Sequence, residues 1–254
     1  MLVDSHAHLD RFEDELGAAL ARARLQGVER FLTTGTSLSN SRDAVQQALR
    51  HDGLFAGVGL HPWWLEQPPD DARLQALADL AKANPAKVIA VGEIGLDYQE
   101  RFVGNKENQI ACFRRMIALA RELKLPMSMH SRLANDDFVR LLREEKGNEV
   151  GGCWHGYGGD EHDARVAIEM GFCIGVGKAI LRPEGEDLRQ VIAALPLESL
   201  MTETDASKAP PDQPERGPWE TRDVALGLAQ LKGISVAECE AVTTANFERV
   251  FGGA

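Results

Sequence analysis

Eight short apolar runs, spread along nearly the whole chain, constrain the fold of this sequence more than any other feature. They occupy residues 2–3, 30–33, 54–60, 88–91, 126–129, 150–154, 172–176 and 199–202. Charged, alanine- and leucine-rich stretches lie between them, for example at residues 14–25, 72–83, 108–123 and 136–145. Their apolar residues recur every three or four positions, which is typical of amphipathic helices. Strands that alternate with helices form mostly parallel sheets, and eight such strands close a barrel.

The chain is expected to form a single domain spanning residues 1–254, a (β/α)8 TIM barrel. A length of 254 residues is usual for one such barrel, and no linker or break in composition divides the sequence. An open doubly wound sheet is the alternative. It is disfavoured because no Gly-x-Gly-x-x-Gly nucleotide-binding motif follows a predicted strand, and Gly57-Val58-Gly59 lacks the third glycine.

Helix boundaries can be predicted from capping residues. Ser39, Asp70 and Asp160 are expected to begin helices, since their side chains accept hydrogen bonds from free backbone N–H groups. Gly27, Gly147 and Gly171 are expected to end helices.

The composition indicates a cytoplasmic protein. Hydrophobic residues make up 44% of the chain, enough for a substantial core, yet no apolar run approaches the roughly 20 residues that span a membrane. The N-terminal apolar run is too short for a signal peptide. The four cysteines form no Cys-x-x-Cys pair and are expected to be small buried side chains in a reducing compartment.

A His-x-His pair follows the first apolar run. Alternate side chains of an extended strand point to the same face, so His6 and His8 would present two imidazoles together. Neutral imidazoles suit a divalent transition metal, which holds its ligands at about 2.0–2.2 Å. Such a pair is often merely packed in a core, so the interpretation depends on the rest of the chain.

Further polar side chains end later apolar runs, where a parallel barrel gathers its strand termini. They are Glu93, His130, His155 and Asp205. A buried carboxylate such as Glu93 is normally ion-paired or metal-bound, and we favour a carboxylate that bridges two ions. His130 and His155 would complete one ion's shell, and His6, His8 and Asp205 the other's. Asp205 could alternatively cap a turn, but in the metal site it would also deprotonate the attacking water.

Four other polar residues are candidates for supporting roles. His61, after the third run, could orient substrate or stabilise charge, although a loop-fixing hydrogen bond is an alternative. Arg132 could grip a phosphate oxygen or form an ion pair at the rim of the barrel. Asp4 and Asp97 could accept hydrogen bonds from metal-bound imidazoles, or simply stabilise turns.

Together these motifs resemble the TatD-type metal-dependent DNase family of amidohydrolase-like barrels. The matching segments are residues 4–10, 59–62, 91–98, 130–132, 155–159, 203–205 and 246–247, in order along the chain. The resemblance implies a TIM barrel with two metal ions that hydrolyses phosphodiesters, often as a 3′→5′ exonuclease on DNA. It implies that His6, His8 and Asp205 hold one ion and His130 and His155 the other, with Glu93 bridging. His61 and Arg132 would lie near the scissile phosphate.

The rim of the pocket departs from the family pattern. Lys178 stands where a small residue is usual, and after Ala206, which follows the Glu-Thr-Asp block, Ser207 and Lys208 replace the usual proline and tyrosine. Lys178 and Lys208 could contact a phosphate or another anionic substrate, or they could be solvated.

The sequence thus favours a deoxyribonuclease that uses two divalent ions (Mg²⁺, Mn²⁺ or Zn²⁺), with DNA as its partner and no obligate protein partner or membrane. A small-molecule amidohydrolase or esterase on the same metal centre is the alternative, because the formal net charge of −11 opposes non-specific binding to a polyanion. A barrel that only binds DNA or protein is a third reading, disfavoured by the six apparently intact ligands.

Overall fold

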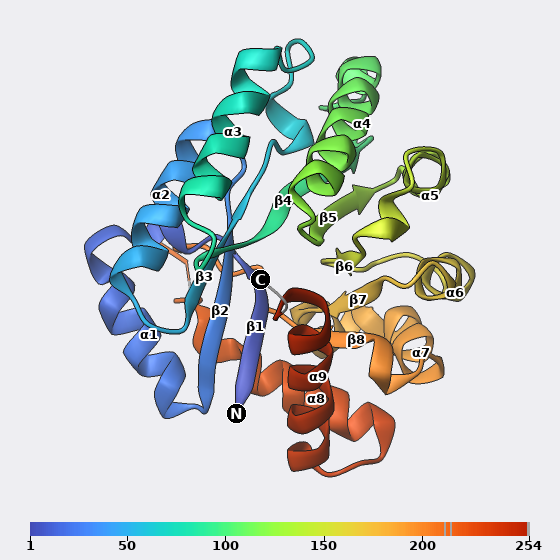
Figure 1. Cartoon of the computed structure of the whole chain (residues 1–254). Helices are drawn as coiled ribbons and strands as arrows, with labels where there is room; N and C mark the ends of the chain where they lie inside the picture. Colours follow the sequence, from blue (N-terminus) through green and yellow to red (C-terminus); the bar gives the residue numbers. More distant parts are fainter. Residues whose placement is uncertain (211, 214, 253–254) are drawn as a thin grey trace.

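Eight parallel strands form a single sheet in sequence order (Figure 1). The computed structural model describes residues 1–210, 212–213 and 215–252. The strands are β1 (Leu2–Ala7), β2 (Val28–Thr34), β3 (Leu54–Val58), β4 (Val88–Asp97), β5 (Met127–Arg132), β6 (Gly152–Trp154), β7 (Cys173–Val176) and β8 (Leu200–Thr202). Each of the eight runs predicted from the sequence overlaps one strand.

Backbone contacts between the two edge strands, β1 and β8, and the segments next to them close the sheet into a barrel. Ala7 pairs with Ala206 in a parallel bridge, and the N–H of Asp205 donates to the carbonyl of His6 at 3.0 Å. These contacts join the end of β1 to the segment that follows β8. Helices surround the strands (Figure 1). The chain is therefore a single-domain (β/α)8 TIM barrel, which confirms the predicted fold.

Helices α1 to α7 connect successive strands on the outside of the barrel, and α8 and α9 follow the last strand. They are α1 (Leu16–Leu25), α2 (Leu38–Arg50), α3 (Asp71–Ala83), α4 (Lys106–Leu123), α5 (Asn135–Glu144), α6 (Glu161–Glu169), α7 (Glu186–Ala194), α8 (Thr221–Lys232) and α9 (Val236–Phe251). Buried apolar faces of the helices and strands form a continuous core. Of the described helices, none is both long and apolar enough to cross a membrane.

Helix α9 covers the amino-terminal end of the barrel. Phe247 and Phe251 are buried with Val3, Leu32 and other side chains that fill the barrel interior. The amide of Asn246 donates to the carbonyl of Leu200, at the start of β8, at 2.8 Å. The polar residues at the carboxyl ends of the strands lie at the other end of the barrel.

The capping predictions were partly right. Asp70 and Asp160 do cap α3 and α6, each accepting from a backbone N–H three residues on. The prediction that Ser39 caps a helix was wrong, because Ser39 lies inside α2. Ser37 caps this helix instead, since its backbone is extended and its hydroxyl accepts from the N–H of Asn40 at 3.2 Å.

The glycine predictions were also partly right. Gly27 and Gly171 follow α1 and α6 with φ of 81° and 89°, a left-handed conformation that glycine adopts without strain. The prediction that Gly147 ends a helix was wrong, since Gly147 begins a short 3₁₀ turn and Lys146 takes the left-handed conformation instead. All four cysteines are buried and free, as predicted.

Candidate metal centre

The polar residues predicted at the strand ends converge on one pocket of about 220 Å³. The pocket is lined by His8, Arg11, Thr36, His61, Trp63, Glu93, His130, Arg132, His155, Asp205 and Ser207. His6 lies directly beneath, fully buried. The structure thus brings together the six candidate metal ligands, with His61 and Arg132 beside them.

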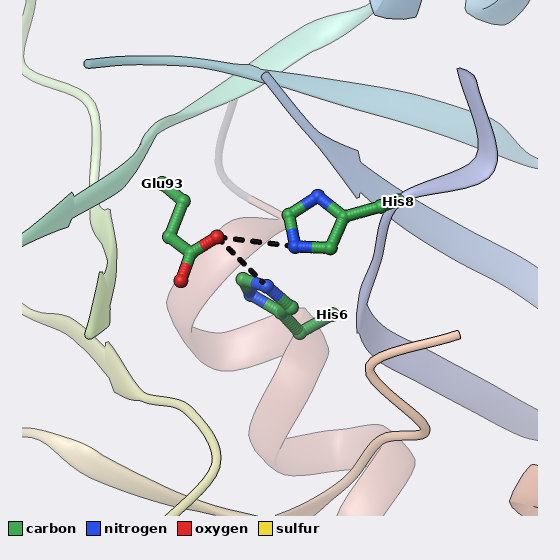
Figure 2. Close-up of side chains that lie close together, drawn as sticks. All are labelled: His6, His8 and Glu93. Atoms are coloured by element: carbon green, nitrogen blue, oxygen red, sulfur yellow. Dashed lines mark ion pairs between the residues drawn. The ribbon is translucent and has the colours of Figure 1, made fainter. Parts of the chain in front are cut away.

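Glu93 lies at the centre of the site, and one of its oxygens faces the His-x-His pair (Figure 2). Oε2 lies 3.1 Å from Nε2 of His8 and 3.6 Å from Nε2 of His6. Nε2 of His8 is also 3.4 Å from Oδ1 of Asp205. Because His6 and His8 stand two residues apart at the end of β1, they reach this oxygen from the same side of the barrel.

The other oxygen of Glu93 faces a second group of imidazoles. Oε1 lies 2.8 Å from Nε2 of His155, 3.1 Å from Nε2 of His61 and 3.2 Å from Nδ1 of His130. These rings come from β5 and from the segments after β3 and β6. Glu93 therefore separates two clusters of nitrogen donors, one on each carboxylate oxygen.

The charges of the site are strongly coupled. Burial alone would raise the pKa of Glu93, but the surrounding imidazoles hold this pKa well below its usual range. Burial would likewise lower the pKa of His8, yet Glu93 and Asp205 raise it to about 9. The pKa of His61 is lowered, mainly by burial, so its imidazole is neutral at pH 7. The carboxylate is thus held ionised beside the His8 imidazole, which carries an extra proton at pH 7 when no metal is bound.

Hydrogen bonds to the far side of two rings fix which nitrogen faces Glu93. Nδ1 of His8 lies 3.1 Å from the carbonyl oxygen of Thr34, which can only accept, so the proton is on Nδ1. Nε2 of His130 lies 3.2 Å from Oδ2 of Asp97 and donates to that carboxylate. In the neutral rings, Nε2 of His8 and Nδ1 of His130 thus direct lone pairs at oxygens of Glu93.

A lone pair that faces a carboxylate oxygen requires a cation between them, either a proton or a metal ion. Two donors bound to one ion at about 2.1 Å stand roughly 3.0–3.4 Å apart, and the spacings from Glu93 to His8 and His130 fall in this range. Three groups have donor atoms that all lie within 4.8 Å of one another: His6 with His8 and Glu93, His6 with His155 and Asp205, and His61 with Glu93 and His130. The site fits divalent metal ions.

Asp97 contacts a metal-ligand candidate, as predicted, and it holds a tryptophan as well. Its Oδ2 accepts from Nε1 of Trp63 at 2.6 Å in addition to His130. Burial would raise the pKa of Asp97, but the hydrogen bonds from His130, Trp63 and the N–H of Gln99 lower it. The carboxylate is therefore ionised and orients the imidazole.

Of the two roles considered for Asp4, the contact with a metal-bound imidazole is wrong. Both of its oxygens accept from Thr204, from the backbone N–H at 3.0 Å and from the hydroxyl at 2.6 Å, and neither contacts an imidazole. Burial raises the pKa of Asp4 to about 7. Asp4 thus connects β1 to the segment after β8, and it positions Asp205 through the backbone.

Sequence reasoning missed Glu203, which lies behind His155. Its Oε1 is 3.7 Å from Nδ1 of His155 and accepts from the N–H of Gly156. The carboxylate fits there because residue 175 is glycine, where a Cβ would collide with Oε2 of Glu203. Glu203 directly precedes Thr204 and Asp205, but nothing in the sequence indicates that its side chain, rather than that of a neighbour, contacts His155.

Three other pocket residues carried no usable signal in the sequence. Arg11, Thr36 and Trp63 follow β1, β2 and β3, outside the apolar runs. Arg132, which was predicted, lines the pocket, and its guanidinium makes no ion pair or hydrogen bond within the described residues.

Comparison with known proteins identifies the family. The model of the family "TatD related DNase" matches residues 3–252. The chain is 32% identical to the uncharacterized metal-dependent hydrolase YabD of Bacillus subtilis (strain 168), over 99% of both chains. It is 34% identical to the 3′-5′ ssDNA/RNA exonuclease TatD of Cronobacter sakazakii, over 95% of this chain and 93% of that one.

Among solved structures, YjjV, a TatD homologue from Escherichia coli K12, matches with a TM-score of 0.90 and 32% identity. The match covers 100% of this chain and 98% of YjjV. The family match, the barrel and the gathered donor set agree. The chain is a metal-dependent hydrolase and belongs to the TatD related DNase family.

Proposed function

We propose that this chain, as one domain spanning residues 1–254, is a two-metal phosphodiesterase that removes nucleotides from the 3′ end of single-stranded DNA. Residues 211, 214 and 253–254 lie outside the described residues. The observation that carries the proposal is the position of Glu93, whose two oxygens face separate groups of imidazoles. The name of the Cronobacter sakazakii relative supports the substrate and the direction.

In this proposal the ligands divide as the sequence suggested. His6, His8 and Asp205 would hold one ion, His130 and His155 would hold the other, and Glu93 would bridge them. Imidazole ligands suit Zn²⁺ and Mn²⁺, and Mg²⁺ is the usual ion of phosphoryl transfer. The free, buried cysteines are consistent with a reducing cytoplasm.

His61 serves as a donor in this scheme. The backbone N–H of Trp63 donates to Nδ1 of His61 at 3.3 Å, so the proton of this neutral ring is on Nε2, which faces the pocket. Nε2 lies 3.1 Å from Oε1 of Glu93 in this structure, and once metal ions take up that carboxylate its N–H can donate to a phosphate oxygen. Arg132 offers a bidentate contact to the same phosphate. These two residues orient the scissile group.

Asp205 is the proposed general base. Its side chain is 56% exposed and lines the pocket beside His8, where water reaches it. When bound, the divalent ions lower the pKa of the attacking water and neutralise charge in the transition state. A carboxylate oxygen of Asp205 takes the proton that the water loses.

A small-molecule amidohydrolase or esterase is the second candidate. The small pocket volume and the formal net charge of −11 favour it, because an acidic chain repels a polyanion outside the immediate site. The same metal centre would serve either reaction, so the substrate has to be tested directly.

The test uses metal-free protein with Mg²⁺, Mn²⁺ or Zn²⁺ and single-stranded DNA labelled at its 5′ end. Progressive shortening from the 3′ end is expected, together with its loss in Glu93→Gln. Hydrolysis of ester or lactone panels without any shortening of DNA would replace the proposal by the second candidate. Inactivity on all substrates would leave a barrel that only binds.

A further inference from the structure

Two arginines line the pocket from opposite sides of its mouth. Arg11 lies in the 3₁₀ helix Leu9–Glu15 that directly follows β1, and Arg132 is the last residue of β5. In a closed ring of eight strands in sequence order, β1 and β5 lie across the barrel from each other. The carboxylates and imidazoles of the metal centre lie between them.

Among the described residues, the guanidinium groups of Arg11 and Arg132 form no ion pair and donate no hydrogen bond, and Arg11 interacts with the carboxylate of Asp10 only through its charge. The neighbouring carboxylate of Asp10 accepts instead from Asn40, at 3.1 Å. Unlike these arginines, the two lysines that the sequence suggested for anion binding are ion-paired. Lys178 is paired with Glu220 at 2.8 Å and Lys208 with Glu15 at 3.0 Å.

Within the described part of the chain, the guanidinium groups of these two arginines are therefore available for an anion. The chain has a formal net charge of −11 and so an excess of carboxylates, and many of its other arginines are ion-paired. Arg121 pairs with Glu149, and Arg165 with Glu161, each at 2.7 Å. A guanidinium presents paired N–H donors that match a phosphate, so both free arginines suit phosphate groups.

We propose that Arg11 binds a second phosphate of the substrate, the one on the 5′ side of the phosphate that is cleaved. Arg132 follows His130 and reaches the scissile phosphate, whereas Arg11 approaches from β1, across the mouth of the pocket. The inference rests on the proposed phosphodiesterase activity. It makes the preferred substrate an oligonucleotide end with at least two phosphates, rather than a neutral ester or amide.

The test compares two trinucleotides of equal length. One is d(TpTpT), and the other carries a neutral methylphosphonate at its 5′ linkage, so that only the charge of the flanking phosphate is lost. For the wild-type protein, kcat/KM is expected to be about tenfold or more higher for the charged substrate, the scale of a hydrogen bond to an ionised group. In Arg11→Met this ratio falls to about one, through KM and not kcat, as expected for a contact made equally in the ground and transition states.

Salt dependence provides a second measurement. Loss of one phosphate contact lowers the slope of log(kcat/KM) against log salt concentration by about 0.7 for a single strand. Arg50→Met is the matched control, since it removes the same charge from an exposed position at the end of α2, before β3 and so at the amino-terminal end of the barrel. It should change neither the ratio nor the slope.

The outcomes separate the two proposals. If the wild type cleaves neither trinucleotide, the proposed exonuclease activity is wrong. If it cleaves both and Arg11→Met keeps the wild-type ratio, the activity stands and the role of Arg11 is wrong. A ratio lowered equally in Arg11→Met and Arg50→Met would also overturn that role, because the effect would then come from net charge alone.

Discussion

The imidazole of His6 lies flat against that of His155, with ring centroids 3.6 Å apart and planes within 5° of parallel. Both rings are buried, and two protonated imidazoles could not stack so closely without strong repulsion. Burial and the neighbouring His155 lower the pKa of His6, which is therefore neutral. The stack thus keeps the imidazole of His6 in its neutral form, in which one ring nitrogen has a lone pair available for a metal ion.

Glu93→Gln is expected to empty the metal centre while the barrel stays folded. The amide keeps the shape of the side chain but removes the charge that balances the surrounding imidazoles. Bound metal, measured by elemental analysis after dialysis, should fall below one ion per chain. Turnover should fall by more than about a hundredfold, beyond the usual effect of losing a residue that only orients a ligand. Unchanged metal content would contradict the central place given to Glu93.

Asp97→Asn should weaken metal binding less severely. The amide cannot match the ionised acceptor that orients His130, and such contacts are typically worth about 10–100-fold in metal affinity. Titration with a competing chelator measures this affinity. Trp63→Phe, which removes the other donor to Asp97 and keeps an aromatic ring, should cause a smaller loss. An effect of Trp63→Phe as large as that of Asp97→Asn would contradict this ranking.

Gly175→Ala should destabilise the protein by about 1–3 kcal/mol, the usual cost of overpacking a filled site. An added Cβ would collide with the carboxylate of Glu203, which is fully buried. Thermal unfolding measures the change, expected to be a fall in Tm of about 2–12 °C, since about 1 kcal/mol shifts Tm by 2–4 °C at this size. Gly104→Ala is the control because nothing lies within 4 Å of its added Cβ.

The carboxylate of Asp137 should make stability depend on pH in the acid range. Arg140, Lys106 and the hydroxyl of Tyr98 hold the pKa of Asp137 well below its usual value of 3.8. A lowered pKa stabilises the fold above the unfolded-state value, and this stabilisation is lost as the pH falls through the folded-state value.

Asp137→Asn should therefore be less stable than the wild type at pH 7 by about 1 kcal/mol, a modest figure because water screens this partly exposed site. The difference should narrow below about pH 4, where the unfolded-state carboxyl takes up its proton. Urea unfolding at a series of pH values measures it. A difference that stays constant from pH 7 to pH 2 would exclude this electrostatic origin.

Removing metal should lower Tm and make it depend on metal concentration. An ion that binds only the folded state adds about 2.7 kcal/mol at a hundred times its Kd, which corresponds to roughly 5–10 °C at this size. Calorimetry with EDTA and with graded Mn²⁺ or Zn²⁺ measures the shift. A Tm that is insensitive to both would argue against a bound ion at Glu93.

The sequence predicted the barrel and the position of its site well. The order of apolar runs and helices specifies parallel strands, and a parallel barrel brings all strand ends to one face. This is why Glu93 and His130, 37 positions apart in the chain, could be expected to meet. The prediction needed only the position of each residue after a strand.

What the sequence could not supply depends on local backbone geometry and strand register. Strand β4 was expected to end near residue 91 but continues to Asp97, because its backbone pairs with β5 as far as Arg132 despite two glycines. Ser37 rather than Ser39 caps α2 because its φ and ψ, and not its residue type, place the hydroxyl over the helix end. The contact between His155 and Glu203 depends on how far β6 and β8 extend, which the residue pattern does not encode.

The carboxylate of Asp97, which contacts both Trp63 and His130, limits how this enzyme can be altered. A substitution that reshapes the tryptophan side of the pocket also changes how firmly a metal ligand is held, so selectivity and metal affinity would shift together there. Elsewhere in the pocket, Ser207 and Arg11 carry no such connection within the described residues. Attempts to redirect the enzyme to new substrates should therefore begin with those two positions.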